Sequence, residues 1–430
     1  MKSRTVIILW AIAIVLGIAA SIVKFGSNDD NATRTTLSPG DKLIENLPIR
    51  EITEVILTKG NDATKLVRTG EDTWGVTERG DYAVDYELLR NLLGALGQLE
   101  VTQGYPSESK HFERFGLADE TEIEKEEAIR VTMKGKDGVQ VAEVFLGKYS
   151  GTSRAGGRFV RLSSDDSGVY AVGETFPGVT AAPKDWVNKE FLKIDQIKSI
   201  ALSAPANPIF KSWKLIRHPK TDGNENPSGQ FTLEGMTDQE VMQLTSTNPL
   251  RNLFSYSAFQ DILSESEAAK TSGADTKLKR QAVITTYDGF TYTLTFWAQK
   301  EKPKDPNADP RLPGVQPGYL LTIIVTADIA EKRVPVTDES KEKPEVIKSR
   351  DAEFALKQKA LKEKLATAQA FKGRIYQISQ STISPLQKKR SDFVKAKNKP
   401  TATTPAVRVP ANPGQPGQPL RPLQPLSPQR

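Results

Sequence analysis

The 430-residue chain contains no cysteine. This absence excludes thiol nucleophiles, cysteine-ligated zinc sites and disulfide bonds, and it excludes a lipoprotein anchor, whose lipid is attached to cysteine. If the chain is exported, its stability must therefore come from core burial. Hydrophobic residues make up only 37% of the chain, and 27 Pro and 30 Gly indicate long polar segments.

Histidine is almost absent as well. His111 and His218 are the two that occur, each in a polar stretch without metal-ligand spacing. The chain also lacks a Gly-x-Ser-x-Gly elbow, a Walker A loop and a Gly-x-Gly-x-x-Gly fingerprint. Hydration is a sufficient reason for the acidic run 122–127 and the Asp pairs at 29–30 and 165–166. We therefore expect no catalytic, cofactor-binding or metal-binding residues, no cofactor, and no enzymatic activity.

One long hydrophobic run is present, at the N-terminus. Val6–Val23 is 18 residues without a charge, and a helix of that length is roughly 27 Å long, close to the thickness of a bilayer core. A signal peptide cleaved near residues 19–21 and a buried soluble helix are the alternatives. Lys2 and Arg4 favour a cytoplasmic N-terminus. We expect a single-pass anchor in a bacterial cytoplasmic membrane, with the bulk of the chain on the periplasmic side.

Signals for strands and a helix follow this run. Ile52–Leu57 nearly alternates apolar and polar residues, as expected for a strand with one buried face. Residues 63–77 are expected to form the second arm of a hairpin with it, and Trp74–Val76 closes that hairpin. Asp85 can cap a leucine-rich helix that ends near Leu99 and whose broad apolar stripe suits one face of a sheet.

A second part of the chain repeats this order of signals. Ile197–Leu202 is matched with the first strand, and Trp213 with Trp74. Residues 241–254 are expected to form the second covering helix, although Pro249 interrupts them. The alternative is that unrelated strands and helices share such signals. Because the order and the residue types agree, we expect an α+β fold of two tandem repeated units of antiparallel strands.

The spacing of later landmarks indicates an insertion in the second unit. Asp185 and Asp392 lie 207 residues apart, whereas the earlier pairs differ by about 150. The insertion is charged and rich in helix formers, with apolar residues seven apart, which predicts one long helix. This helix either projects toward a partner or packs on its own domain. The expected organisation is an N-terminal transmembrane anchor (1–25), a polar tether (26–43), a first α+β repeat unit (44–195), a second unit (196–397) with a helical insertion (340–373), and a disordered Pro-rich tail (398–430).

Positive charge is concentrated at the C-terminal end. Residues 340–399 carry 16 Lys and Arg against 6 Asp and Glu, although the whole chain has a net charge of only +6. A solvated helix is one reading, and contact with an anionic lipid or wall polymer is another; the expected location argues against nucleic acid. In the tail, prolines recur at every third position from 413 to 428, which suits a polyproline II rod, either disordered or used as a docking peptide.

Short motifs in the first unit resemble a bacterial family known as domain of unknown function 4340. The resemblance follows the hydrophobic N-terminal span and rests on the order of these motifs: Ile52, Val55 and Leu57; Trp74; Asp85 and its leucine helix; Phe115-Gly116-Leu117; Leu146-Gly147; Val169-Tyr170; and Asp185-Trp186 to Leu192. It covers residues 44–202 well and the second unit more loosely. The charged insertion and the proline tail depart from the family pattern.

The resemblance implies a membrane-anchored extracytoplasmic protein. Members of the family are often associated with ABC-type transport systems like those of gliding bacteria, so the resemblance implies an accessory or binding role in an envelope complex. The expected partners are the inner membrane, through residues 6–23, and ABC-transporter or cell-envelope proteins. A second expectation is a protein that binds a small ligand or wall polymer in a cleft between the two units.

Overall fold

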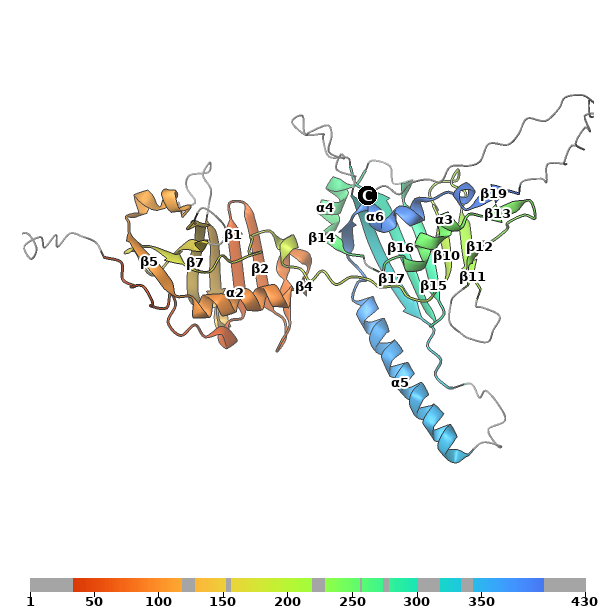
Figure 1. The fold of residues 1–430 in the computed structure, drawn as a ribbon, viewed down its shortest axis with the longest axis horizontal. Helices are drawn as coiled ribbons and strands as arrows, with labels where there is room; N and C mark the ends of the chain where they lie inside the picture. The colour runs from red at the N-terminus through yellow and green to blue at the C-terminus, as the bar shows by residue number, and fades with distance from the viewer. Residues whose placement is uncertain are drawn as a thin grey trace, which may run out of the picture.

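The computed structural model describes residues 34–117, 128–151, 156–218, 229–255, 257–273, 278–300, 318–333 and 343–397, which form a mixed α+β fold around two antiparallel sheets (Figure 1). The hydrophobic run 6–23 and the tail 398–430 lie outside these residues. Within the described ranges, none of the helices combines the length and the apolar character needed to span a bilayer.

The first sheet has nine strands in the order β4-β3-β2-β1-β6-β7-β8-β9-β5. The helix α2 (Tyr86–Gln98) covers one face (Figure 1). Short 3₁₀ turns lie at Ile49–Glu51 (η1), Thr77–Arg79 (η2), Ser109–Phe115 (η3), Lys136–Gly138 (η4) and Pro183–Asp185 (η6). The strands are β1 (Glu54–Lys59), β2 (Asp62–Arg68), β3 (Trp74–Val76), β4 (Tyr82–Ala83), β5 (Val101–Pro106), β6 (Ile129–Lys134), β7 (Gln140–Tyr149), β8 (Arg158–Leu162) and β9 (Gly168–Val172).

Local sequence explains this first unit. Alternation in β1 places Val55 and Leu57 in the core, both fully buried. The Asp85 carboxylate accepts a hydrogen bond from the Leu88 N–H at 3.1 Å, which caps α2 as predicted. The buried side of α2 packs on the sheet through four leucines: Leu89, Leu92, Leu93 and Leu96.

The second sheet has eight strands in the order β12-β11-β10-β15-β16-β17-β18-β14, and a separate ribbon pairs β13 with β19. The 3₁₀ turns here are η7 (Asn248–Asn252), η10 (Ser384–Gln387) and η11 (Arg390–Asp392). The helices are α3 (Leu244–Thr247), α4 (Glu265–Thr271), α5 (Pro344–Gln369) and α6 (Gln380–Ile383). The strands are β10 (Ile197–Ser203), β11 (Trp213–Arg217), β12 (Phe231–Leu233), β13 (Glu240–Met242), β14 (Phe259–Leu263), β15 (Arg280–Thr286), β16 (Phe290–Ala298), β17 (Tyr319–Ala327), β18 (Ile375–Ile378) and β19 (Val394–Ala396).

The two sheets have the same strand order when β1 is aligned with β10, except that β4, at the end of the first sheet, has no counterpart among the described strands of the second. Both outermost pairs are irregular at the same place, between Val101 and Gln103 in β5 and between Phe259 and Asp261 in β14. The start of each covering helix is also held alike. The Asp85 N–H donates to the Trp186 carbonyl at 2.7 Å, and the Gln243 N–H donates to the Phe393 carbonyl at 2.8 Å.

Two sequence expectations in the second unit are wrong. Trp213 begins β11, the counterpart of β2, whereas Trp74 begins β3, whose counterpart β12 begins at Phe231. Both tryptophans open a strand after a turn and are buried, so the residue type could not distinguish neighbouring strands. Residues 241–254 do not form one helix: β13 occupies the start, α3 has four residues, and Pro249 lies in the 3₁₀ turn η7.

The helix α5 lies within the predicted insertion and extends away from the second sheet (Figure 1). One side of the helix nevertheless contacts its own unit. The Lys364 ammonium lies 2.7 Å from an Asp288 carboxylate oxygen, and the Gln358 side chain donates to the Ala330 carbonyl at 3.0 Å. The helix therefore both packs on its own domain and projects from it.

Residues 34–43, expected as part of a tether, lie along the β5 edge of the first sheet, and we call them the N-terminal strap. The Gly40 N–H donates to the Val101 carbonyl at 2.8 Å, and the Leu43 N–H donates to the Leu99 carbonyl at 2.7 Å. Leu43 is 2% exposed, so it belongs to the core. The strap therefore pairs with backbone groups at and just before the start of β5, which would otherwise lie open at this edge of the sheet.

Candidate functional site

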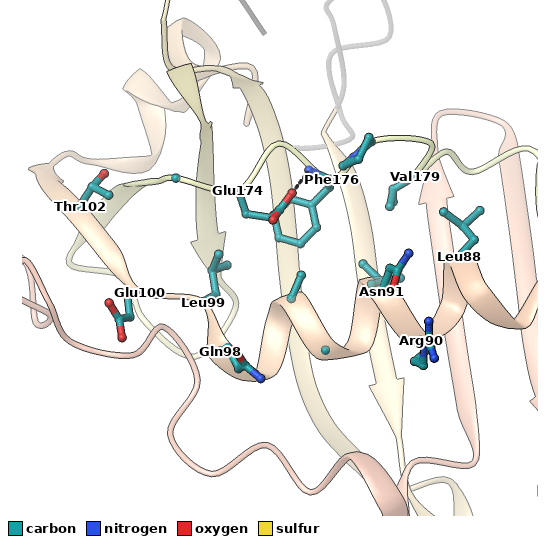
Figure 2. Close-up of a pocket in the computed structure, with 15 residues that line it drawn as sticks. Leu88, Arg90, Asn91, Gln98, Leu99, Glu100, Thr102, Glu174, Phe176 and Val179 are labelled. Atoms are coloured by element: carbon teal, nitrogen blue, oxygen red, sulfur yellow. Dashed lines mark hydrogen bonds between the residues drawn. The ribbon is translucent and has the colours of Figure 1, made fainter. Parts of the chain in front are cut away.

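Two of the hollows between described residues have volumes typical of binding sites. The first, which we call the α2 groove, has a volume of about 710 Å³ and lies between α2 and the segment 173–179 (Figure 2). The second, the junction pocket, has a volume of about 460 Å³ and lies where the two units meet. Ligand sites in proteins commonly fall between about 300 and 1,000 Å³.

The α2 groove is formed by the side of the helix that flanks the leucine core. Leu88, Asn91, Ala95 and Gln98 follow one another at spacings of three or four residues, so they share one side of α2. Leu99 and Val179 add apolar surface to the lining. The groove therefore combines an apolar floor with a few amide groups.

The opposite wall is a turn held in an unusual conformation. Phe176 has φ = 53°, in the left-handed region that a non-glycine residue seldom adopts. One Glu174 carboxylate oxygen fixes this turn by accepting the N–H groups of Thr175 at 2.9 Å and Phe176 at 3.0 Å (Figure 2). The Phe176 ring is buried beneath the turn, so the wall is rigid and presents no open aromatic face.

Two glycines of the groove are required neither by backbone conformation nor by packing. A Cβ added to Gly94, in the middle of α2, would meet no atom within 4 Å, and the same holds at Gly173 on the other wall. Neither glycine has a positive φ. By contrast, a Cβ at Gly97 would lie 3.0 Å from Ile49 Cδ1, so Gly97 fulfils the expected role of close packing.

Charged side chains of opposite sign lie at the two ends of the groove. Arg90 is near its Leu88 end, and Glu100 is near its Thr102 end (Figure 2). Glu174 adds a second carboxylate, already engaged in the turn. The ends of the groove thus differ in charge, and Glu174 lies between them, so the lining carries one arginine against two glutamates (Figure 2).

The units are joined beside the junction pocket by one bidentate ion pair. Arg79 Nε lies 2.7 Å from Asp261 Oδ1, and Arg79 Nη2 lies 2.9 Å from Asp261 Oδ2. Both side chains are about nine-tenths buried, with 11% and 9% of their surfaces exposed. Burial acts to lower the pKa of Arg79, but the hydrogen-bonded Asp261 carboxylate outweighs it and the pKa is raised.

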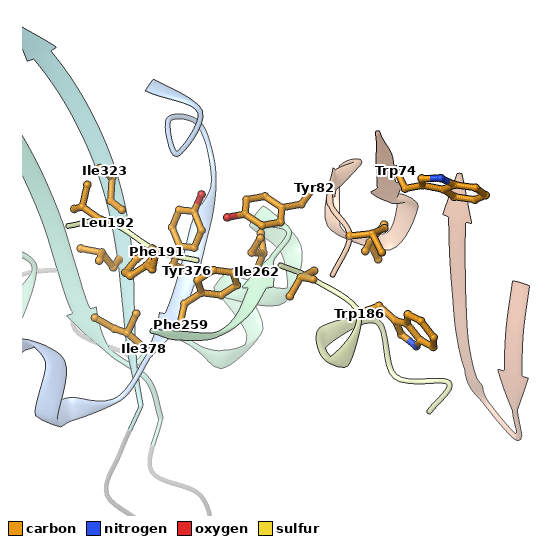
Figure 3. Close-up of a cluster of buried hydrophobic side chains, with 14 of the residues drawn as sticks. Trp74, Tyr82, Trp186, Phe191, Leu192, Phe259, Ile262, Ile323, Tyr376 and Ile378 are labelled. Carbon is orange, nitrogen blue, oxygen red and sulfur yellow. The ribbon is translucent and has the colours of Figure 1, made fainter. Parts of the chain in front are cut away.

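An aromatic cluster continues the core from one unit into the other (Figure 3). The Tyr82 ring, from β4, lies 5.7 Å from the Phe259 ring of β14, edge to face. Phe191, in the connection between the units, lies 5.1 Å from Tyr376 and 5.6 Å from Phe371. Burial raises the pKa of Tyr82 and that of Tyr376. The rings make one hydrophobic core that spans both units.

The junction pocket lies over this contact, with charges of both signs in its lining. Glu78 and Arg79 line it from the first unit, Glu265 from α4, and Lys372 and Arg374 from the segment that follows α5. Arg79 is already paired with Asp261, and the Arg374 guanidinium lies 5.1 Å from the centre of the Tyr82 ring. The pocket is therefore a polar hollow above an apolar floor.

The two histidines and the acidic residues do not form a metal or catalytic site in the described structure. His111 lies in η3 and His218 follows β11, in different units. In the described ranges, no group of three or more His, Asp or Glu residues is placed to hold a metal ion. Residues 29–30 and 122–127 fall outside those ranges.

Asp165 has a structural role that hydration does not account for. Its carboxylate accepts a short hydrogen bond from the Tyr170 hydroxyl and another from the Ser167 N–H at 2.9 Å. The Tyr170 hydroxyl in turn accepts the Leu37 N–H of the strap at 3.2 Å. Burial acts to raise the pKa of Asp165, but these hydrogen bonds prevail and lower it. The explanation of Asp165 by hydration alone is therefore wrong.

Sequence reasoning missed the α2 groove and the Arg79–Asp261 pair. A signal for the groove was present: Asn91 and Gln98 interrupt the leucine pattern seven residues apart, which places two amides on one side of the helix. No comparable signal marks the ion pair, because its partners are 182 residues apart in the chain.

Comparison with protein families finds one match. Residues 74–281 match the family model described as Domain of unknown function (DUF4340). The matched range contains most of the α2 groove, including Gly94 and the Phe176 turn, and both partners of the Arg79–Asp261 pair. It ends before α5. Searches of curated proteins and of solved structures found no match.

Proposed function

Because residues 74–281 of this chain belong to the family of domain of unknown function 4340, we propose that the protein is a non-enzymatic, membrane-anchored component of an extracytoplasmic complex. In this proposal, residues 6–23 hold it in the bacterial cytoplasmic membrane. The two α+β units lie on the periplasmic side, where they contact an ABC-transporter-like or other envelope partner. The resemblance stated above supplies the class of partner.

The N-terminal strap is the observation that best supports this proposal. Ten residues, 24–33, separate the hydrophobic run from Arg34, and a chain of that length spans at most about 35 Å. The strap then lies directly on the β5 edge. An anchor at residues 6–23 would therefore keep this edge near the membrane. Figure 1 shows the second unit and α5 on the side of the first unit away from the strap, where a partner can reach them.

We also infer that the two units are tandem copies of one ancestral unit. The shared strand order, the matching irregularities of β5 and β14, and the matching hydrogen bonds to Trp186 and Phe393 support this inference. The copies have since diverged, because α2 has 13 residues whereas α3 has four, and α5 occurs in the second copy.

Protease accessibility in spheroplasts tests the location. With residues 34–397 outside the cytoplasm, added protease should digest the protein without lysis, while a cytoplasmic marker stays intact. A variant with Leu9→Arg and Val15→Arg should lose membrane attachment, since charges are costly in a bilayer core. Protection from protease in intact spheroplasts would overturn the proposal. Recovery of ABC-transporter subunits from detergent extracts by the wild type, but not by this variant, would support the partner class.

A second candidate function is ligand binding between the two units, and the junction pocket is the observation that favours it. Its 460 Å³ would hold a small polar ligand, and ligand binding to the folded state raises stability by mass action. Soluble wall fragments and sugars should then raise the melting temperature of the wild type but not of Lys372→Glu. An equal response in both proteins would place any binding elsewhere.

A further inference from the structure

We propose that the α2 groove binds an extended peptide segment of about five residues, with an acidic group toward Arg90 and a basic group toward Glu100. This inference rests on the proposed function, because the bound segment would belong to the partner protein proposed there. Peptide binding itself can be measured without the membrane.

The size of the groove suits such a segment. Arg90 and Glu100 are ten residues apart along α2 and its end, which corresponds to about 15 Å. An extended peptide rises about 3.3 Å per residue, so four to five residues bridge the two charges. The volume of about 710 Å³ leaves room for side chains.

The polar groups in the middle of the groove suit a peptide backbone. Asn91 and Gln98 each offer an amide that can both donate and accept a hydrogen bond. Neither side chain has a hydrogen-bond partner within the part of the chain that the structure describes. Peptide N–H and C=O groups need both kinds of partner along one stretch, whereas a phosphate or sulfate would need cations.

The two glycines keep the lining of the groove narrow. Gly94 and Gly173 both line it, and a Cβ added to either would meet no atom within 4 Å. Gly94 lies four residues from both Arg90 and Gln98, so it shares their side of α2. A peptide can therefore pass between Arg90 and Gln98 without meeting a side chain at residue 94.

The lining favours peptide over carbohydrate. Sugar sites commonly present an aromatic face, but the aromatic residue of this lining, Phe176, is only 3% exposed. Aliphatic side chains of Leu88, Leu99 and Val179 line the groove instead. One arginine against two glutamates also disfavours a polyanion, because a phosphate-rich polymer would meet net negative charge.

The test measures binding of defined peptides to the full chain in detergent micelles at low salt. The probe is fluorescently labelled acetyl-Lys-Ala-Val-Ala-Glu-amide, and its control is acetyl-Gln-Ala-Val-Ala-Gln-amide. Two exposed ion pairs of about 0.5–1 kcal/mol each predict binding of the charged peptide about fivefold to thirtyfold more tightly. Equal affinity for both peptides, or no saturable binding of either, would overturn the proposal.

Arg90→Glu gives the sharper result, because it should change the preference rather than abolish binding. With carboxylates at both ends, the groove should favour acetyl-Lys-Ala-Val-Ala-Lys-amide over the Lys–Glu probe. Lys59→Glu, a charge reversal at an exposed residue outside the groove, is the matched control and should keep the wild-type preference. If Arg90→Glu and Lys59→Glu change the affinities alike, the effect is one of net charge and the groove is not the site.

Asn91→Leu tests the groove directly. Asn91 follows Leu88 on the side of α2 that forms the groove and is exposed, so the change removes one amide and adds bulk there. Probe binding should fall at least tenfold while the melting temperature does not fall. Unchanged binding would contradict the proposal, and so would tighter binding of chitotetraose than of either peptide. If the peptides fail to bind, but protease digests the protein in spheroplasts and the wild type recovers ABC-transporter subunits, only the inference about the groove is rejected and the proposed function stands.

Discussion

At the scale of single residues, the contact between the two units depends on two side chains that no sequence pattern connects. Arg79 and Asp261 are buried, and they satisfy each other in a bidentate geometry. A buried pair contributes little net stability relative to an apolar pair, but removal of one partner leaves an uncompensated charge. The pair therefore determines which surfaces of the two units come into contact, and it adds little to the stability of that contact.

Arg79→Ala should destabilise the protein by about 3 kcal/mol, because Asp261 would remain buried without its partner. The measurement is equilibrium unfolding in urea. The double variant Arg79→Leu with Asp261→Leu should recover much of the loss. A loss below about 0.5 kcal/mol for Arg79→Ala would mean that water reaches Asp261 freely and that the junction is looser than the structure shows.

Asp165 should make attachment of the strap dependent on acid. Its pKa is lowered in the folded state, so its contribution to stability is present above the pKa of the unfolded chain, about 3.9, and is lost as the pH falls through the folded value. The protection of the Leu37 N–H, which is its exchange rate relative to the intrinsic rate at the same pH, should therefore fall below about pH 4. Asp165→Asn should lose this protection at neutral pH as well. Wild-type protection that does not change between neutral and acidic pH would contradict this role.

At the scale of elements, α2 shows what sequence reasoning can predict and where it fails. Its cap at Asp85 and its leucine stripe were predicted, because they depend on residues within one turn of each other. The pairing of Trp213 with Trp74 was wrong, since the identity of a strand is set by neighbours that lie far away in the chain. Local chemistry predicts an element, but the register between elements needs tertiary contacts.

The two helical glycines of α2 should respond in opposite ways to alanine. Gly94→Ala should stabilise the protein by about 0.5–1 kcal/mol, because it gains helix propensity and the added methyl meets no atom. Gly97→Ala should give no gain or a loss, since Ile49 lies 3.0 Å from the added carbon. Thermal unfolding of the two variants checks this. Equal increases in stability for both variants would show that the Ile49 side chain in η1 moves aside at little cost.

The candidate site was less predictable than the fold. The groove forms only where two segments distant in the chain meet. The segment at Phe176 takes its shape from the Glu174 carboxylate, which holds a turn with a left-handed residue. The sequence Gly-Glu-Thr-Phe-Pro-Gly at 173–178 indicates a turn, but it does not indicate which helix the turn will face. The amides of Asn91 and Gln98 were visible as polar positions, whereas the space beside them was not.

At the scale of the whole molecule, the aromatic core should make the two units unfold together. Phe191 touches Phe259, Phe371 and Tyr376 at the contact. Phe191→Ala should cost about 3–5 kcal/mol, and calorimetry should show the single transition of the wild type divide into two. A Phe112→Ala variant, altered in the separate cluster on the first sheet, should destabilise without that division. Two transitions already present in the wild type would mean that the units are not coupled.

The N-terminal strap has a consequence for how far the protein could move from a membrane. If residues 6–23 sit in a membrane, ten residues separate them from Arg34, and the strap then pairs with the backbone beside β5. The anchor would therefore hold the start of the strap within about 35 Å of the bilayer. Because the aromatic core joins the two units, the second unit would move together with the first.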